Sequence, residues 1–268
     1  MTQARWFPPL LFGALAIALG FLTLPIVAIF VDTGPGELLA SLDDPAAVDA
    51  LTLSLWTSAL AVLIIVLVGT PAAYLLATRS FRGRSVVVTL IELPLVLPPA
   101  VAGIGLLAAL GPNGLLGGAL EDAGAQVVLT TAAVVLALTF VAAPFYLRQA
   151  EAAFAALDRS WLEASRTLGA GEATTFVRVA IPAALPGLIA GLALAWGRAL
   201  GEFGATLMFA GSFRGVTQTV PLAIYERFAT DFTAALGLSA VLVAVSAAIL
   251  LTVKLATRAS GGRGHVAR

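Results

Sequence analysis

Two charged residues inside an apolar stretch are the side chains in this sequence most able to do chemistry. Arg198 and Glu202 lie four residues apart within Ala183–Ala210, a segment otherwise rich in Ala, Leu and Gly. At this spacing two side chains share one face of a helix and can form an ion pair. Exposing either charge to hydrocarbon costs several kcal/mol, so we expect both to face another helix or a water-filled path. The pair can pin helix packing or guide an anion, and the sequence leaves both roles open.

The other apolar stretches offer little else that could catalyse a reaction or bind a metal. Glu92 is a second acid in such a stretch, where it can cap a neighbouring backbone or pair with an arginine at the membrane edge. The chain has no cysteine, and its one histidine, His265, lies in the polar C-terminal tail. Without a thiol, an imidazole or an aspartate in the apolar stretches, an intramembrane enzyme lacks a catalytic dyad. We therefore expect no catalytic residue, no metal site and no cofactor.

The chain also lacks the phosphate loop of a nucleotide hydrolase. Its sole lysine, Lys254, follows Val253, whereas that loop places a lysine directly after a glycine. Energy for any driven process must therefore come from another subunit or from an ion gradient. Within the apolar stretches only Glu92 and Glu202 could relay protons, which is a thin basis for a proton-coupled carrier.

Membrane-spanning helices must position these side chains. The chain is 60% hydrophobic and 11% charged, with a mean hydropathy of +1.01, which is typical of a membrane protein. Continuous apolar runs favour helices over the alternating strands of a barrel. Six runs reach the roughly 20 residues that a helix needs to cross the hydrocarbon: Phe7–Val31, Leu51–Thr78, Val86–Leu110, Val127–Leu147, Ala183–Ala210 and Phe232–Leu255. We expect an all-α bundle of six transmembrane helices, with residues 1–268 forming one domain whose core covers about residues 51–255.

Prolines and glycines shape two of these spans. Pro98 and Pro99 predict a kink in Val86–Leu110, because a proline lacks a backbone donor and strains the preceding turn. The span Ala183–Ala210 carries glycines four residues apart, a spacing that lets another backbone approach closely, as tight packing or hinge motion requires. These glycine pairs are Gly187 with Gly191 and Gly197 with Gly201.

Basic residues predict the orientation. In a six-span arrangement one side carries Arg5, Arg79, Arg82, Arg84, Arg148, Arg159, Arg166, Arg178, Lys254, Arg258, Arg263 and Arg268. The other side carries Arg214 and Arg227 against the acids Asp32, Glu37, Asp43, Asp44, Asp49, Glu121, Asp122, Glu226 and Asp231. Since the positive side of a membrane protein faces the cytoplasm, we expect both termini there.

The two chain ends carry further expectations. Arg5 followed by an apolar run is compatible with a cleaved signal peptide, but Phe7–Val31 exceeds the usual apolar region of such peptides. We interpret it as a retained first helix; if it were removed, the other spans would keep their orientation. Residues 258–268 are polar and rich in glycine, and we expect a disordered cytoplasmic tail there.

A polar stretch on the basic side separates two of the spans. Its sequence from Glu163 to Pro182, EASRTLGAGEATTFVRVAIP, predicts short helices over Ser160–Leu168 and Glu172–Val179. Gly169 between them can adopt the left-handed geometry that ends a helix. Small side chains at positions 164 and 165 let this bracket (residues 160–182) seat in a groove of another protein. A helix lying on the bilayer surface is the alternative.

The bracket resembles the EAA loop of ABC importer permeases. The resemblance rests on Glu163, Ala164, Ser165, Gly169, Val179, Ile181 and Pro182. Ser165 stands in place of the last Ala of that pattern, Val179 in place of Ile, and Ile181 in place of Leu. In that family the loop docks the ATPase subunit, so the resemblance implies that these residues contact a cytoplasmic ATPase.

A second resemblance concerns the substrate. The segment Arg198–Gly211, RALGEFGATLMFAG, is similar to the fifth-span signature of molybdate permeases, and Gly215–Tyr225 is similar to their GxTQTxPxxIY segment. Leu93–Gly105 resembles their third span. Sulfate/thiosulfate permeases share the Gly-Glu-Phe-Gly core, so such a permease is the alternative. We expect the residues that line or pack the pathway to include Arg198, Gly201, Glu202, Gly204, Pro98 and Pro99.

Together the resemblances imply an ATP-driven importer of molybdate or tungstate, of the type I importer permease fold, working by alternating access. They imply a homodimer in the lipid bilayer of the cell membrane, two cytoplasmic ABC ATPase subunits docked on residues 160–182, and an extracytoplasmic oxyanion-binding protein. Nothing implies a nucleic-acid partner. A stand-alone secondary anion carrier is an alternative of a different class; an inverted repeat of unwound helices would favour it, and none is evident.

Overall fold

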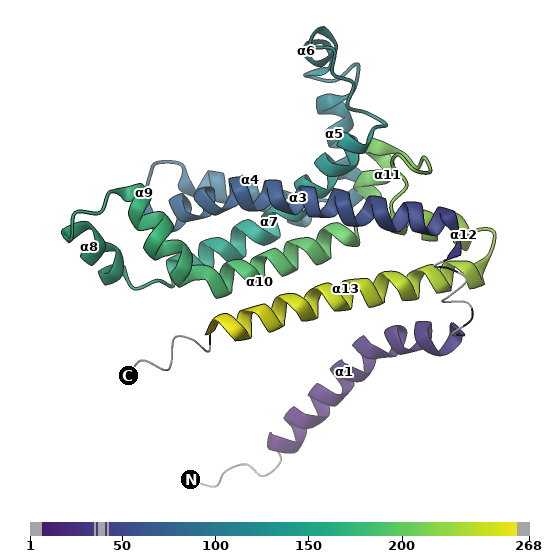
Figure 1. Ribbon diagram of the computed structural model, residues 1–268, viewed down its shortest axis with the longest axis horizontal. Helices are drawn as coiled ribbons and strands as arrows, with labels where there is room; N and C mark the ends of the chain where they lie inside the picture. The colour runs from purple at the N-terminus through teal and green to yellow at the C-terminus, as the bar shows by residue number, and fades with distance from the viewer. Residues whose placement is uncertain (1–6, 35, 37–40, 42, 262–268) are drawn as a thin grey trace.

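Long apolar helices form the framework of the computed structural model, which describes residues 7–34, 36, 41 and 43–261 (Figure 1). Five helical runs are long and apolar enough to cross a membrane. They contain α1 (Phe7–Asp32), α3 (Pro45–Thr78), α7 (Thr131–Ala155), α10 (Ile181–Leu200) and α13 (Phe232–Gly261). Helices α4 (Arg84–Val96) and α5 (Pro99–Leu110) are long and apolar enough only when taken together, and they are bent by 118° relative to each other, as in a broken span or a re-entrant loop. The residues described contain no strand, so the prediction of an all-α membrane bundle is confirmed.

Shorter elements decorate the two ends of the bundle. At one end lie α8 (Arg159–Thr167), α9 (Glu172–Thr175) and the π-helical turn η1 (Phe176–Ala180); at the other lies α12 (Val220–Phe228) (Figure 1). An arm built from α5 and α6 (Gly117–Asp122) projects from the side of the bundle, with α11 (Gly204–Ala210) beside its base. From α12, helix α13 runs back toward the α8–α9 end (Figure 1).

Small side chains let α3, α7 and α10 pack closely. Alanines fill their contact, with Ala61, Ala137 and Ala195 fully buried. Tyr146 of α7 is buried among them, and its hydroxyl lies 2.6 Å from the Thr70 hydroxyl of α3. With lipid outside, association of helices depends on such close packing and on hydrogen bonds between them.

The first predicted glycine pair makes the close approach expected of it. A Cβ added at Gly187 would lie 2.4 Å from the Cβ of Ala153, and one at Gly191 would lie 3.1 Å from the Cβ of Gln149, so α10 meets α7 nearly backbone to backbone. Gly197 has no neighbour within 4 Å of such a position, and Gly201 meets only its own helix. The second pair therefore serves no close packing within the described chain.

Two expectations about the spans need correction, and the kink of the third span is larger than the sequence indicates. The fifth span is not one helix over Ala183–Ala210: α10 ends at Leu200 and α11 begins at Gly204. The predicted kink of the third span is confirmed, and it is so sharp that α5 turns away from the axis of the bundle (Figure 1). The disordered tail does not begin at residue 258, since α13 continues to Gly261; residues 262–268 lie outside the described part.

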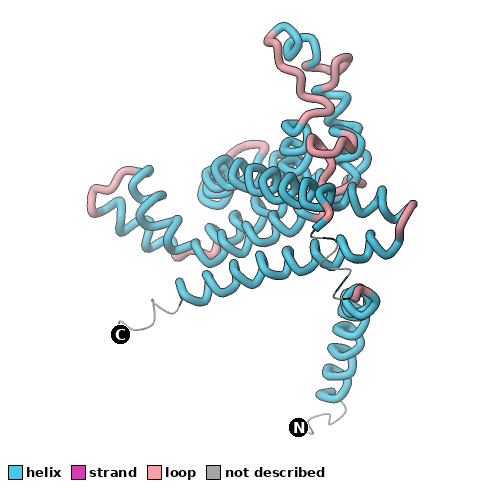
Figure 2. The backbone as a smooth tube through the Cα atoms, turned by 45° about the vertical axis from the view of Figure 1, so that its right-hand side comes forward, coloured by secondary structure: helices cyan, strands magenta, loops and turns pink. Residues whose placement is uncertain are grey.

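Helix α1 stands away from the layer of α3, α7 and α10 (Figures 1 and 2). It packs on α13, and almost its whole surface is exposed. That surface is apolar on every side, including Phe12, Ile17 and Phe21. A helix that is apolar all round suits a lipid environment or a neighbouring membrane helix.

Candidate functional site

The first helix of the bracket is held by local hydrogen bonds at both ends. Asp158 caps α8, and its carboxylate accepts a hydrogen bond of 2.9 Å from the Ser160 amide. The Ser160 amide and hydroxyl hold the pKa of Asp158 below its usual range. At the other end Gly169 has a φ of +85°, and the Ala170 amide donates to the Ser165 carbonyl at 3.1 Å. The predicted left-handed turn at Gly169 is confirmed.

The bracket presents part of its surface outward and joins its own halves on the inner side. Glu163 and Ala164 are exposed, and Leu168 is 88% exposed. Inside, the Ser165 hydroxyl lies 3.0 Å from the buried Thr175 hydroxyl, which links α8 to α9. Ser165, which replaces an alanine of the family pattern, thus braces the bracket rather than lying on its outer face.

Aromatic packing fastens the bracket to the bundle. The Phe176 ring of η1 lies 4.8 Å from that of Tyr74 in α3, and the Tyr74 ring lies 5.3 Å from that of Phe154 in α7. Arg79 at the end of α3 forms an ion pair with Glu172 of α9. A displacement of the bracket would therefore be transmitted to α3 and α7.

The second half of the bracket continues directly into the membrane helix. The sequence predicts a separate element over Glu172–Val179, but α9, η1 and α10 form one helical run from Glu172 to Leu200. In its π turn the Ile181 amide donates to the Phe176 carbonyl. Pro182 accounts for the wide turn, because its ring would clash with the carbonyl four residues earlier in a regular helix. Val179 and Ile181 are partly buried at this turn, and Pro182 is exposed.

Away from the bracket, the breaks in the third and fifth spans meet. Pro98 caps α5, and Gly204 starts α11. A Cβ added at Gly204 would lie 3.0 Å from the Cβ of Pro99, and one at Gly103 would lie 2.7 Å from the Ala205 carbonyl oxygen. The structure thus brings together Pro98, Pro99 and Gly204, which the sequence assigns to the pathway or its packing. We call residues 99–110 with 204–210 the α5–α11 unit.

Arg198 and Glu202 form the predicted ion pair at this junction. Nη2 of Arg198 lies 2.6 Å from Oε2 of Glu202. Glu202 does not share a helix face with Arg198, however, because it follows Gly201, where α10 has ended. Its other oxygen, Oε1, accepts a hydrogen bond of 2.7 Å from the Ala205 amide in the first turn of α11. The Glu202 side chain is 1% exposed and that of Arg198 is 26% exposed.

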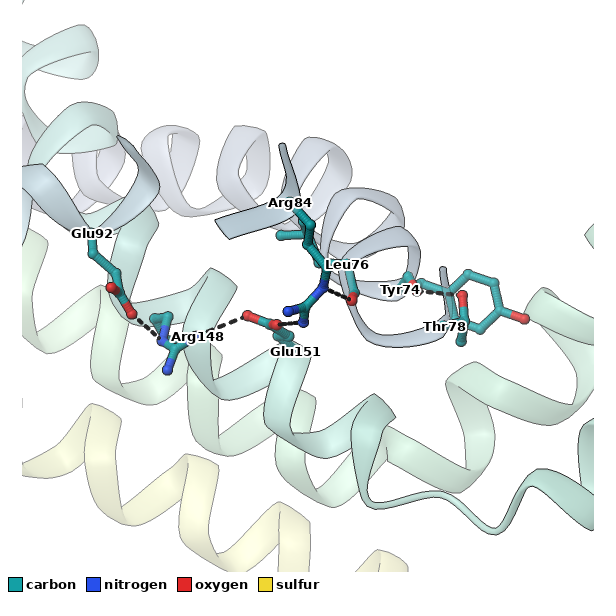
Figure 3. A network of polar contacts seen from close by, with 7 residues as sticks. All are labelled: Tyr74, Leu76, Thr78, Arg84, Glu92, Arg148 and Glu151. Atoms are coloured by element: carbon teal, nitrogen blue, oxygen red, sulfur yellow. Dashed lines mark hydrogen bonds and ion pairs between the residues drawn. The ribbon is translucent and has the colours of Figure 1, made fainter. Parts of the chain in front are cut away.

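A second charged network lies toward the bracket end, and the sequence predicts only part of it (Figure 3). Glu92 of α4 pairs with Arg148 of α7 at 3.0 Å, which confirms that it pairs with an arginine. Arg148 also pairs with Glu151 at 3.0 Å, and Glu151 pairs with Arg84 at 2.7 Å. Nε of Arg84 donates to the Leu76 carbonyl at the end of α3. The sequence reasoning missed Glu151, although its position three residues after Arg148 was a usable signal.

Ion pairs also tie the loops at the α12 end. Arg214 lies 3.1 Å from Asp49 near the start of α3, and Arg227 of α12 pairs with Asp44, the cap of α3. The Ser54 hydroxyl accepts a hydrogen bond of 2.8 Å from the Val220 amide at the start of α12. These contacts hold α12 and the loop before it against α3.

Comparison with known proteins identifies the family. Residues 69–261 match the family described as the binding-protein-dependent transport system inner membrane component. The chain belongs to this family.

The described residues contain no group of His, Cys, Asp and Glu that could hold a metal ion.

Named relatives align with most of the length of this chain. It is 46% identical to the molybdenum transport system permease protein ModB of Mycobacterium tuberculosis, over 87% of this chain and 88% of that protein. It is 36% identical to the probable transport system permease protein NifC of Clostridium pasteurianum, over 93% of this chain and 88% of that one. These relatives are transport permeases, and their names favour neither an intramembrane enzyme nor a sulfate permease.

Solved structures support the fold. A bacterial alginate ABC transporter, in complex with an alginate-bound periplasmic protein, matches with a TM-score of 0.70 at 18% identity, over 92% of each chain. The MetNI methionine ABC transporter, in an inward-facing conformation, matches with a TM-score of 0.58 at 19% identity, over 80% of this chain and 94% of that one. The predicted fold of a type I ABC importer permease is therefore confirmed. A stand-alone carrier is not what the family indicates, although the third and fifth spans are broken.

Proposed function

We propose that this chain is the permease subunit of an ATP-driven importer that moves molybdate, or the similar oxyanion tungstate, across the cell membrane by alternating access. The relatives named for molybdenum transport support the substrate class. The permease itself would be non-catalytic, since the sequence has no phosphate loop. ATP would be hydrolysed by a separate subunit.

The observation that carries this proposal is the bracket. It offers exposed Glu163, Ala164 and Leu168 on one side, and on the other its Phe176 ring packs with Tyr74 of α3 and Phe154 of α7. A docking ATPase would therefore move the bracket and α10 together. Closure of two ATPase subunits on ATP would draw two brackets toward each other and open the transport path to the outside. Hydrolysis of ATP would return the path to its inward-facing state.

The orientation and assembly are part of the proposal. Arginines concentrated on the bracket side support a cytoplasmic bracket and cytoplasmic termini. The interior of the bundle between α3, α7 and α10 is filled with buried side chains, so a path between two copies of the chain is more reasonable than one through a single copy. A binding protein would deliver the oxyanion at the α12 end.

The α5–α11 unit and Arg198 are the proposed passage for the anion. A doubly charged oxyanion favours guanidinium or backbone donors, and Arg198 is the basic side chain placed at the two helix breaks. One guanidinium that already has a carboxylate partner gives only weak binding. We therefore expect discrimination among molybdate, tungstate and sulfate to lie mainly in the binding protein, and no submicromolar affinity of the permease alone for molybdate.

The experiment is uptake of labelled molybdate by vesicles that contain the permease, its ATPase and its binding protein. We expect uptake that requires ATP and the binding protein and that excess unlabelled tungstate suppresses more than sulfate does. Uptake without ATP, driven by an ion gradient, would contradict the proposal. Equal suppression by sulfate at matched concentrations would contradict the substrate assignment.

A further inference from the structure

Glu202 divides its two carboxylate oxygens between the two halves of the broken fifth span. Oε1 accepts the Ala205 amide of α11 at 2.7 Å, and Oε2 lies 2.6 Å from the Arg198 guanidinium in the last turn of α10. The carboxylate itself is almost completely buried. One side chain thus links the charge at the end of α10 to the start of α11.

The hydrogen bond of Glu202 to the Ala205 amide and its ion pair with Arg198 differ in how easily an arriving anion can compete with them. The Ala205 amide lies in the buried first turn of α11. Arg198 is 26% exposed, and among the residues that the structure describes Glu202 is its one ion-pair partner. A guanidinium has five N–H donors, so an arriving oxyanion can engage it from the exposed side. An anion would therefore weaken the ion pair at Oε2 and leave the hydrogen bond at Oε1 intact.

Helix α11 cannot move alone. Gly103 of α5 faces the Ala205 carbonyl and the Met208 Cβ so closely that an added Cβ would lie 2.7 Å and 2.8 Å from them. Gly204 packs on Pro99 and on the Ala100 amide in the same way. Contacts between backbones at this range keep α5 and α11 together as one body. A change at Glu202 would consequently displace the whole α5–α11 unit relative to α10.

We propose that Glu202 is a positioning residue that couples the arrival of an oxyanion at Arg198 to release of the α5–α11 unit from α10. The inference rests on the proposed function, because it needs an anion that reaches Arg198. In the anion-free state the Arg198–Glu202 bond holds the unit against the end of α10. When the anion takes the guanidinium, Glu202 stays with α11 through the Ala205 amide and the unit is free to shift.

The absence of native cysteine allows a direct test. Single cysteines at Met208 on α11 and at Leu194 on α10, both exposed, report on the two sides of the junction. Met208→Cys retains the Cβ that packs on Gly103. The permease–ATPase complex in lipid nanodiscs is labelled with a maleimide, with and without millimolar molybdate. We expect molybdate to change the labelling rate of Met208→Cys several-fold and to leave that of Leu194→Cys unchanged.

The informative variant is Glu202→Gln, because a glutamine carbonyl can still accept the Ala205 amide but cannot form the ion pair. We expect Glu202→Gln to give Met208→Cys the rate seen with molybdate even when no anion is present, with little further response. A wild-type rate and a wild-type molybdate response in Glu202→Gln would overturn the proposal. Arg198→Lys, which keeps a charge, should retain part of the response.

Failure of the inference and failure of the proposed function give different results. If vesicles take up molybdate but Met208→Cys never responds to it, the coupling is wrong and the transport function stands. If vesicles take up no molybdate but Glu202→Gln still changes the Met208→Cys rate, the substrate is wrong and the positioning role of Glu202 stands.

Discussion

The bracket and the α5–α11 unit are both built at interruptions of membrane helices, yet they are stabilised in opposite ways. The bracket is exposed, and it is held by its own caps, by the Ser165–Thr175 contact and by a ring cluster around Tyr74. The α5–α11 unit is held by backbone contacts at Gly103 and Gly204 and by one buried carboxylate. The first can be recognised from neighbouring residues alone; the second exists only where two distant segments meet.

This difference has a consequence for how each region tolerates change. Side chains on the bracket surface can vary without loss of fold, because their outer sides meet no part of the described chain. Where α5 meets α11, at Gly103 and Gly204, even one added carbon must displace neighbouring atoms. We therefore expect bracket variants to fold and lose coupling, and α5–α11 variants to lose stability as well.

The largest loss of stability is expected when Arg198, the more exposed partner of the Arg198–Glu202 ion pair, is replaced. Arg198→Met leaves the Glu202 carboxylate buried with only the Ala205 amide, and removing one partner of a buried pair typically costs about 3–5 kcal/mol. Adding Glu202→Gln removes the stranded charge and keeps the hydrogen bond to α11, so the double variant should recover most of the stability. Thermal unfolding in nanodiscs measures both.

Comparing the single and the double variant also shows whether Arg198 stabilises helix packing or guides the anion. If Arg198 only pins the helices, the recovered double variant takes up labelled molybdate at the wild-type rate in vesicles with matched expression. We expect a folded double variant with poor uptake, because the guanidinium that meets the anion is gone. Normal uptake by Arg198→Met alone would exclude both roles.

Gly103→Val tests the backbone contact of the α5–α11 unit. The new Cβ would lie within 3 Å of the Ala205 carbonyl oxygen, and overpacking of this kind typically costs about 1–3 kcal/mol. We expect a lower unfolding temperature and little uptake. Gly105→Val is the matched control in the same helix, since nothing lies within 4 Å of a Cβ at that position. An equal loss in both variants would point to helix propensity instead of the contact.

The sequence predicts the spans, the bracket and the Gly169 turn because each depends on residues close together in the chain. Apolar length predicts a span, and a glycine between two short helical patterns predicts a left-handed turn. The partnership of Glu92 with an arginine is predictable as well, since a charge at the membrane edge needs a partner.

The sequence predicts the position of the break in the third span but not its size, and it does not predict the break in the fifth span. Pro98 and Pro99 indicate a disturbance, but the 118° bend depends on α11 packing against α5, a contact between segments about 100 residues apart. Gly201 and Gly204 carried a signal for the break at Glu202, yet an apolar run through Ala210 favours one continuous helix. Glu151 was likewise missed, because its burial between Arg84 and Arg148 depends on how α4 crosses α7.

Gly169→Val tests the bracket by backbone conformation alone. The residue has a φ of +85°, where a branched side chain is strained, and nothing lies within 4 Å of its Cβ position. A left-handed conformation costs a non-glycine residue about 1–2 kcal/mol, which distorts the turn but leaves the bundle intact. We expect normal insertion with loss of ATP hydrolysis stimulated by the loaded binding protein.

Gly171→Val is the control for this variant, because Gly171 has an open Cβ position and a φ of −67°, which other residues adopt. Glu163→Arg should also reduce coupling by changing the charge of the exposed docking face. Normal copurification of the ATPase and normal uptake in both Gly169→Val and Glu163→Arg would remove the bracket as the ATPase contact.

The smallest effect concerns the cap of α8, and it tests whether the bracket is rigid through its own hydrogen bonds. Asp158→Ala removes the acceptor of the Ser160 amide, whereas Asp158→Asn keeps one. We expect faster amide hydrogen exchange in α8 for the alanine variant only, with α10 and the α5–α11 unit unchanged.

The hydrogen bonds from Ser160 lower the pKa of Asp158 below its ordinary value of 3.8. The stabilisation of α8 is therefore fully present above that ordinary value and is lost as pH falls through the lower pKa of the folded state. Protection of the α8 amides, corrected for intrinsic exchange, should fall in strong acid for the wild type and not for Asp158→Asn. If acid instead loosened α8 equally in both, the cap would not be what holds this half of the bracket.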